Sequence, residues 1–190
     1  MKIYETRNEM INDLLQPDTI GLRVCEVGVF KGDFAEEILK TKPLELVLID
    51  PWKGMNISGN ADGVNVVSAN LDEEYWRLCR KYENRKKVKL IRGLSYEVLE
   101  GFADNYFDAV YIDGDHSYAG VKKDLLVSLR KVKKNGILML HDFDLNPKKC
   151  PYNYDFIPEI NRAVKEFCKE FHYEIFAVAN DGCMSCAIRV

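Results

Sequence analysis

The sequence has no long apolar run, and its charges nearly cancel. No hydrophobic stretch approaches the roughly 18 residues needed to cross a bilayer, and the opening MKIYETRNEM lacks the apolar core of a signal peptide. A formal net charge of -3 gives no bulk attraction for nucleic acid or for an anionic membrane. We therefore expect a cytoplasmic protein without nucleic-acid or membrane partners. Its oligomeric state is left open, a homo-oligomer included.

Six cysteines occur without a secretion signal, which favours reduced thiols in a reducing compartment. Two of them, Cys183 and Cys186, have CxxC spacing, but the segment CMSCAIRV is predicted to be a strand. Residues three apart on a strand point to opposite faces, so the two sulfur atoms should diverge. We therefore predict structural thiols.

Predicted strands and helices alternate along the chain, which favours a parallel sheet covered by helices on both faces. The segments 173–179 and 183–190 flank Asn180-Asp181-Gly182, which is a hairpin signal. At 190 residues the chain fits one domain. We predict a single α/β domain with a seven-stranded, mostly parallel sheet that ends in an antiparallel hairpin. The five parallel strands are expected near residues 22–27, 46–50, 88–92, 107–112 and 136–140.

Two segments lie outside this alternation. Residues 3–15 carry apolar side chains at partly helical spacing and predict a helix within an N-terminal extension over residues 1–20. Residues 51–70 are rich in Gly, Asn and Ser and show no clear periodicity. A loop of this length inside a compact domain is often a lid or a binding loop, and a disordered surface loop is the alternative.

The first predicted strand-helix-strand unit contains a glycine turn. Gly28 and Gly32 permit a tight turn and a close approach of the backbone to a ligand, and Asp33 is placed to cap the helix over residues 34–40. Asp50 lies 22 residues after Gly28. That is near the roughly 20-residue offset at which an acidic side chain accepts hydrogen bonds from ribose hydroxyls.

The spacing of the glycines argues against a dinucleotide. A dinucleotide fingerprint is GxGxxG, whereas this chain has Glu26-x-Gly28-x-x-x-Gly32 and no glycine at position 30 or 33. A pyrophosphate is therefore not the favoured ligand. An NAD(P)-binding oxidoreductase and a turn without any nucleotide stay as alternatives.

The pattern ExGxxxG followed by an acidic strand end resembles motif I and the ribose-binding acid of class I S-adenosylmethionine-dependent methyltransferases. The resemblance implies that the methionine half of S-adenosylmethionine lies over Gly28 and Gly32. It also implies that Glu26 faces the ammonium group and that Asp50 holds the ribose. The expected fold is the Rossmann-like fold of that class, which ends in an antiparallel hairpin as this chain is predicted to do.

A second resemblance is more specific. The strings DGDHSYAGVKKDL, over residues 113–125, and GILMLHDF, over residues 136–143, resemble macrocin O-methyltransferase and related small-molecule methyltransferases. We count Trp52, Ser95 and Asp113 among the cofactor-binding candidates. In the resembling enzymes the serine that matches Ser95 lies along the adenine, although a simple helix N-cap is an equal alternative.

Ionisable residues gather where the fourth and fifth parallel strands are predicted to end. In the resembling enzymes that use a divalent cation, Mg²⁺ or Mn²⁺, the ligands map onto Asp113, His141 and Asp142, with His116 as the proton acceptor. Such a cation would hold the acceptor oxygen and lower its pKa. His141 replaces an acid of the expected pair, and imidazole suits Mn²⁺, Fe²⁺ or Zn²⁺ better than Mg²⁺. Alternatively, His141 and Asp142 only shape the pocket, while Asp113 and Asp115 cap the following helix.

These observations predict an enzyme that transfers a methyl group from S-adenosylmethionine to a small hydroxylated acceptor, such as a sugar or a secondary metabolite. A module that binds the cofactor without turnover is a further alternative. The segments expected to select the acceptor, which include residues 51–70 and 146–156, carry no pattern that identifies it.

Overall fold

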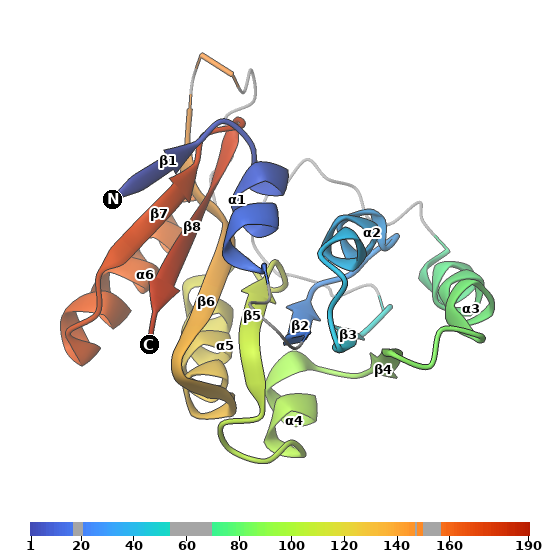
Figure 1. Ribbon diagram of the computed structural model, residues 1–190. Helices are drawn as coiled ribbons and strands as arrows, with labels where there is room; N and C mark the ends of the chain where they lie inside the picture. The colour runs from blue at the N-terminus through green and yellow to red at the C-terminus, as the bar shows by residue number, and fades with distance from the viewer. Residues whose placement is uncertain (17–20, 54–69, 147, 150–156) are drawn as a thin grey trace.

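A computed structural model describes residues 1–16, 21–53, 70–146, 148–149 and 157–190. Within these residues, eight strands form one mixed sheet and six helices surround it (Figure 1). The strands are β1 (Lys2–Tyr4), β2 (Arg23–Val27), β3 (Glu45–Asp50), β4 (Val88–Arg92), β5 (Phe107–Ile112), β6 (Val132–Leu145), β7 (Ile175–Ala179) and β8 (Cys183–Arg189). The helices are α1 (Arg7–Leu14), α2 (Asp33–Lys40), α3 (Leu71–Tyr82), α4 (Ser95–Glu100), α5 (Tyr118–Lys131) and α6 (Ile157–Phe171).

The strand order across the sheet is β1-β7-β8-β6-β5-β2-β3-β4. β8 runs antiparallel to its neighbours β6 and β7, and the other adjacent pairs are parallel. The five predicted parallel strands and the C-terminal hairpin are all present, so the predicted fold class is confirmed. β1 adds an eighth strand because its three residues pair with β7 at the sheet edge.

Each face of the sheet carries its own apolar layer, as expected for parallel strands that are buried on both sides. Successive residues of β5 divide between the layers, because side chains alternate along a strand. Val110 and Ile112 belong to the layer that contains buried residues of α4, α5 and α6, whereas Ala109 and Tyr111 belong to the layer that contains buried residues of α1, α2 and α3. This arrangement leaves the carboxyl ends of the central strands as the edge at which polar side chains can meet.

The N-terminal segment differs from the single helix that we expected over residues 3–15. Residues 2–4 form β1, and α1 begins only at Arg7, after Thr6 has capped it through its side chain. Tyr4 is buried against the sheet, whereas Ile3 is 64% exposed. The apolar residues at this end therefore serve a strand as well as the helix, and three residues are too few for periodicity to reveal a strand.

Three further expectations concern the cysteines, membrane-spanning segments and the long loop after β3. The five described cysteines are free thiols, with Cys186 buried in β8 and Cys183 partly exposed. None of the helices in the described ranges is long and apolar enough to cross a membrane. Most of the expected lid loop, residues 54–69, lies outside the described residues, as do residues 147 and 150–156 of the expected acceptor-selecting segment.

The centre of the sheet gives a test of the fold. Leu138 of β6 pairs with Val110 on one side and Ile188 on the other and has no exposed surface. Leu138→Ala should lower the free energy of unfolding by about 3 kcal/mol, because the deletion leaves a cavity in the apolar layer. Leu126→Ala removes the same atoms from a side chain that is 41% exposed on α5. It should cost less than about 1 kcal/mol. Urea denaturation of both variants measures the difference, and equal losses would contradict this description of the core.

Candidate cofactor and catalytic site

A cavity of about 610 Å³ lies at the carboxyl ends of the central strands. Its walls come from the segments that follow β2, β3, β4 and β5, with further residues from α1 and α5. The sheet order reverses between β2 and β5. In open α/β sheets, ligands bind outside the carboxyl ends of the strands at such a reversal.

The turn after β2 requires glycine at position 28. Gly28 has a φ of 83°, and a Cβ atom added there would lie 1.8 Å from the backbone oxygen of Asp113. Gly32 has a φ of 73° and is the N-cap of α2, which begins at Asp33. The predicted capping role of Asp33 is therefore wrong, because this residue is already in the first turn of the helix, where an acidic side chain interacts favourably with the helix dipole. Gly28 lines the cavity, and Gly32 instead packs against Leu78.

The carboxylate of Asp50 holds this turn in place. Its Oδ2 accepts hydrogen bonds from the backbone N–H groups of Val29 and Phe30, each at 2.9 Å. Its Oδ1 accepts one from the N–H of Trp52 at 2.6 Å. A carboxylate has about four acceptor sites. One site on Asp50 is therefore left to accept a hydroxyl group in the cavity.

Glu26, the residue before the last position of β2, is 1% exposed and lines the cavity. Among the described residues its Oε2 atom has no hydrogen-bond partner. Burial raises the pKa of Glu26 well above its usual range, and the charge of Asp113 adds to this effect while Arg7 opposes it. A buried carboxylate oxygen without a partner is costly. A cationic group with N–H donors in the cavity would remove that cost.

Trp52 and Ser95 take different places from those expected. Trp52 is 1% exposed, is not among the cavity-lining residues, and donates a hydrogen bond of 2.9 Å from Nε1 to the carbonyl of Phe30. It therefore supports the turn. Ser95 does line the cavity, but the N-cap of α4 is Leu94. The Ser95 hydroxyl donates instead to Oδ1 of Asp124 at 2.5 Å.

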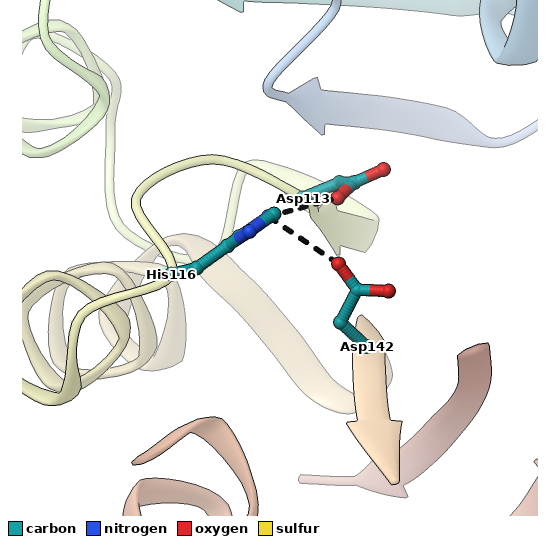
Figure 2. A group of neighbouring side chains, drawn as sticks. All are labelled: Asp113, His116 and Asp142. Atoms are coloured by element: carbon teal, nitrogen blue, oxygen red, sulfur yellow. Dashed lines mark hydrogen bonds and ion pairs between the residues drawn. The ribbon is translucent and has the colours of Figure 1, made fainter. Parts of the chain in front are cut away.

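Figure 2 shows the imidazole of His116 between two carboxylates. Its Nε2 atom is 3.4 Å from Oδ1 of Asp113 and 3.5 Å from Oδ2 of Asp142. One ligand atom from each of the three residues lies within 4.8 Å of the other two. Two carboxylates around an imidazole suit either a proton held on the ring or a divalent cation bound by all three groups.

His141 was expected among the cation ligands, but its ring lies at the margin of this group. Its Nδ1 is 2.9 Å from the hydroxyl of Ser185, its ring stacks on Tyr111, and its Nε2 is 3.4 Å from Oδ1 of Asp142. Of the three expected ligands, the structure brings Asp113 and Asp142 together. His116, the expected proton acceptor, occupies the third corner.

The two carboxylates of this cluster differ in their electrostatics. Asp142 has a φ of 54°, and the pairing of β6 with β8 is interrupted before Asp144. Burial raises the pKa of Asp142, because the two nearby histidines only partly offset it and the charge of Asp113 adds to it. At Asp113 burial also acts to raise the pKa, but His141, His116 and Arg7 outweigh it and the pKa is lowered. Asp113 is therefore the more readily ionised of the pair.

Comparison with known proteins identifies the family. The model of a family described as a methyltransferase domain matches residues 25–143, which is more than half of the chain. The chain belongs to this family. The match contains the glycine turn, Asp50 and all three residues of the cluster in Figure 2.

Individual relatives of this methyltransferase domain are distant. An uncharacterised protein of Acanthamoeba polyphaga mimivirus is 24% identical over 148 residues, which make up 76% of this chain and 58% of that protein. The chain thus spans less than two thirds of the length of this curated relative. The O-methyltransferase NovP superposes with a TM-score of 0.66 at 16% identity, over 96% of this chain and 78% of NovP. A methyltransferase of Podospora anserina bound to S-adenosylhomocysteine superposes with a TM-score of 0.62 at 18% identity. This superposition covers 96% of this chain and 77% of the Podospora protein. These two likenesses show the fold.

Among the charged residues that line the cavity of the methyltransferase domain, the sequence analysis did not single out Arg7 or Asp124. Arg7 of α1 has its Nη1 3.9 Å from Oδ2 of Asp113 and lies over the ring of Phe34. Asp124 is 1% exposed although it is acidic. Asp124 lies three residues after Val121 and next to Leu125, which are both buried apolar residues of α5. A carboxylate on an apolar helix face was the signal that could have found it.

The buried Asp124 makes a testable contribution to pH dependence. Burial raises its pKa to about 6, against the opposing hydrogen bond from Ser95. Between the unfolded value of roughly 4 and this folded value, the folded state binds more protons, so stability falls as pH rises through that window. Asp124→Asn removes the ionisable group and with it this loss of stability at higher pH. Its free energy of unfolding relative to the wild type should therefore increase by up to about 3 kcal/mol between pH 4 and pH 7.

Asp104→Asn is a control of opposite sign. The Lys131 ammonium lowers the pKa of Asp104, so this carboxylate stabilises the fold above its unfolded pKa and the stabilisation is lost as pH falls. The variant should lose stability relative to the wild type as pH rises. Urea denaturation across the pH range measures both, and a pH-independent difference for Asp124→Asn would contradict the burial of its charge.

Proposed function

We propose that this methyltransferase domain transfers a methyl group from S-adenosylmethionine to an oxygen atom of a small hydroxylated acceptor, such as a sugar or a secondary metabolite. The observation that carries the proposal is the buried oxygen of Glu26, which has no hydrogen-bond partner among the described residues, in a cavity that His116 also lines. Two proteins of the same fold add support, since one is named an O-methyltransferase and the other binds S-adenosylhomocysteine.

The residues present fit this cofactor at three points. Glu26 offers a buried acceptor for the ammonium group of the methionine half. Gly28 lines the cavity at the turn after β2, and Asp50 keeps one acceptor site for a ribose hydroxyl. None of these features is a phosphate site, which disfavours the alternative of an NAD(P)-dependent oxidoreductase.

When bound, S-adenosylmethionine supplies an electrophilic methyl group on a sulfonium. The contribution of the chain is to orient the acceptor hydroxyl and to take its proton. The carboxylates of Asp113 and Asp142 flank Nε2 of His116, where they orient the ring and stabilise its protonated form. Methyl transfer needs little further help once the oxygen, the methyl group and the sulfur are in line.

The same three side chains fit a divalent cation, and the two uses of His116 exclude each other. An imidazole whose Nε2 binds a cation cannot take a proton at that atom. If a cation binds here, the two carboxylates suit Mg²⁺ or Mn²⁺, and the imidazole shifts the preference away from Mg²⁺ towards Mn²⁺, Fe²⁺ or Zn²⁺. Such an ion would stabilise the negative charge on the acceptor oxygen.

The role of His116 can be tested by substitution. His116→Ala should lower kcat for transfer of a labelled methyl group by at least about 100-fold, because proton transfer contributes that much. Calorimetry should show nearly unchanged affinity for S-adenosylhomocysteine, since the cofactor contacts are intact. His172→Asn is the matched control, because His172 is exposed and its φ of 59° is one that asparagine adopts. Full activity of His116→Ala would rule the residue out as base or ligand.

Chelation separates the two uses of His116. If the three side chains bind a cation, dialysis against EDTA should abolish methyl transfer and Mn²⁺ should restore it in the wild type but not in Asp142→Asn. If His116 takes the proton directly, EDTA should leave the rate unchanged. Binding of S-adenosylhomocysteine without transfer to any hydroxylated acceptor, with or without metal, would favour the non-catalytic module.

A further inference from the structure

Asp124 is a second buried carboxylate in the cavity. One of its oxygen atoms accepts a hydrogen bond, and the other accepts none within the described residues. Its Oδ1 accepts the hydroxyl hydrogen bond of Ser95 at 2.5 Å. Among the described residues, no hydrogen bond reaches Oδ2, which lies beside Gly114, 3.5 Å from where a Cβ would stand on that glycine. The side chain is 1% exposed and still lines the cavity. The Asp124 side chain therefore borders the cavity and not bulk water.

Asp124 and Glu26 serve different parts of the cavity. The charges that act on Glu26 are those of Asp113, Arg7 and Asp50. The charges that act on Asp124 are those of Asp115 and Lys123. The cavity thus has one buried acceptor near the ends of β2 and β3 and another near the segments that follow β4 and β5.

The wall around Asp124 is suited to a flat, largely apolar group. Leu94 and Tyr96 line the cavity on either side of Ser95, and the ammonium of Lys123 lies 4.9 Å from the centre of the Tyr96 ring. Gly114 and Gly120 also line the cavity. A planar ring with an N–H donor at its edge would pack against these residues and satisfy the open oxygen of Asp124.

The cofactor of the proposed function has N–H donors at its two ends, the ammonium of the methionine half and the exocyclic amine of the adenine. If Glu26 meets the ammonium and Asp50 the ribose, the adenine extends towards the segment after β4. We propose that Asp124, oriented by Ser95, accepts a hydrogen bond from the exocyclic amine and selects adenine over bases that lack it. This inference rests on the proposed function for the identity of the cofactor.

The test compares S-adenosylhomocysteine with its 6-deamino analogue, in which hydrogen replaces the exocyclic amine. For the wild type, calorimetry should show about 100-fold weaker binding of the analogue, because the loss of the amine leaves a buried carboxylate oxygen unpaired. In Asp124→Ala the two ligands should bind within about three-fold of each other, because no carboxylate is left to distinguish them. The readout is the ratio of the two affinities, which a purely structural role for Asp124 would not change.

Two further variants complete the experiment. Asp124→Asn keeps the size of the side chain and loses its charge, so its ratio should fall between those of the wild type and Asp124→Ala, even if the alanine variant folds poorly. Asp33→Asn removes an exposed carboxylate from the rim of the same cavity and should keep the wild-type ratio. A wild-type ratio in both Asp124 variants would overturn this proposal and leave the proposed cofactor intact. Absence of binding by either ligand to the wild type would overturn both.

Discussion

The carboxylate of Asp50 is the contact on which the shape of the cavity depends. It accepts three backbone hydrogen bonds, two from the turn after β2 and one from Trp52, and so joins the ends of two adjacent strands. Trp52 in turn donates from its indole to the same turn. Because these bonds use most of the acceptor sites of Asp50, the side chain is first a structural brace. Its role towards a ligand is limited to the one site that is left.

The residues at this edge of the sheet lower the stability of the fold while they hold the site in a fixed geometry. Phe30, Trp52 and Asp142 adopt φ values of 49°, 39° and 54°, a region that costs non-glycine residues roughly 1–2 kcal/mol each. Glu26 and Asp124 are buried carboxylates whose pKa values are raised by that burial. The apolar layers on both faces of the sheet offset these costs. Burial of these two carboxylates costs free energy in the absence of a ligand. A ligand that supplies N–H donors to both of them would reduce that cost and so stabilise the folded protein.

The sequence predicted most of the fold and part of the site. Apolar runs located the five parallel strands, and Asp-Gly located the C-terminal hairpin. Glu26, Gly28 and Asp50, which line the cavity, could be singled out because glycine and acidic residues at strand ends have a spacing that can be read locally. The three-residue β1 could not be found, because it is too short to show a period.

The arrangement of the cluster could not be read locally. In the structure His116, and not His141, lies next to both Asp113 and Asp142. This choice depends on the left-handed backbone of Asp142 and on Ser185 of β8, which forms a hydrogen bond with His141. Contacts over such sequence distances leave no local pattern. The burial of Asp124 is a similar case, since its partner Ser95 lies 29 positions earlier in the chain.

The proposed pairing of Glu26 with the ammonium of S-adenosylmethionine is tested most directly by calorimetry with two ligands. S-adenosylhomocysteine has the amino-acid group, and 5′-methylthioadenosine keeps the adenosine and the sulfur without it. The wild type should bind the first about 100-fold more tightly, and Glu26→Gln should lose most of that preference because the charge-assisted hydrogen bond is gone. An unchanged preference in Glu26→Gln, or no binding of S-adenosylhomocysteine to the wild type, would contradict the account.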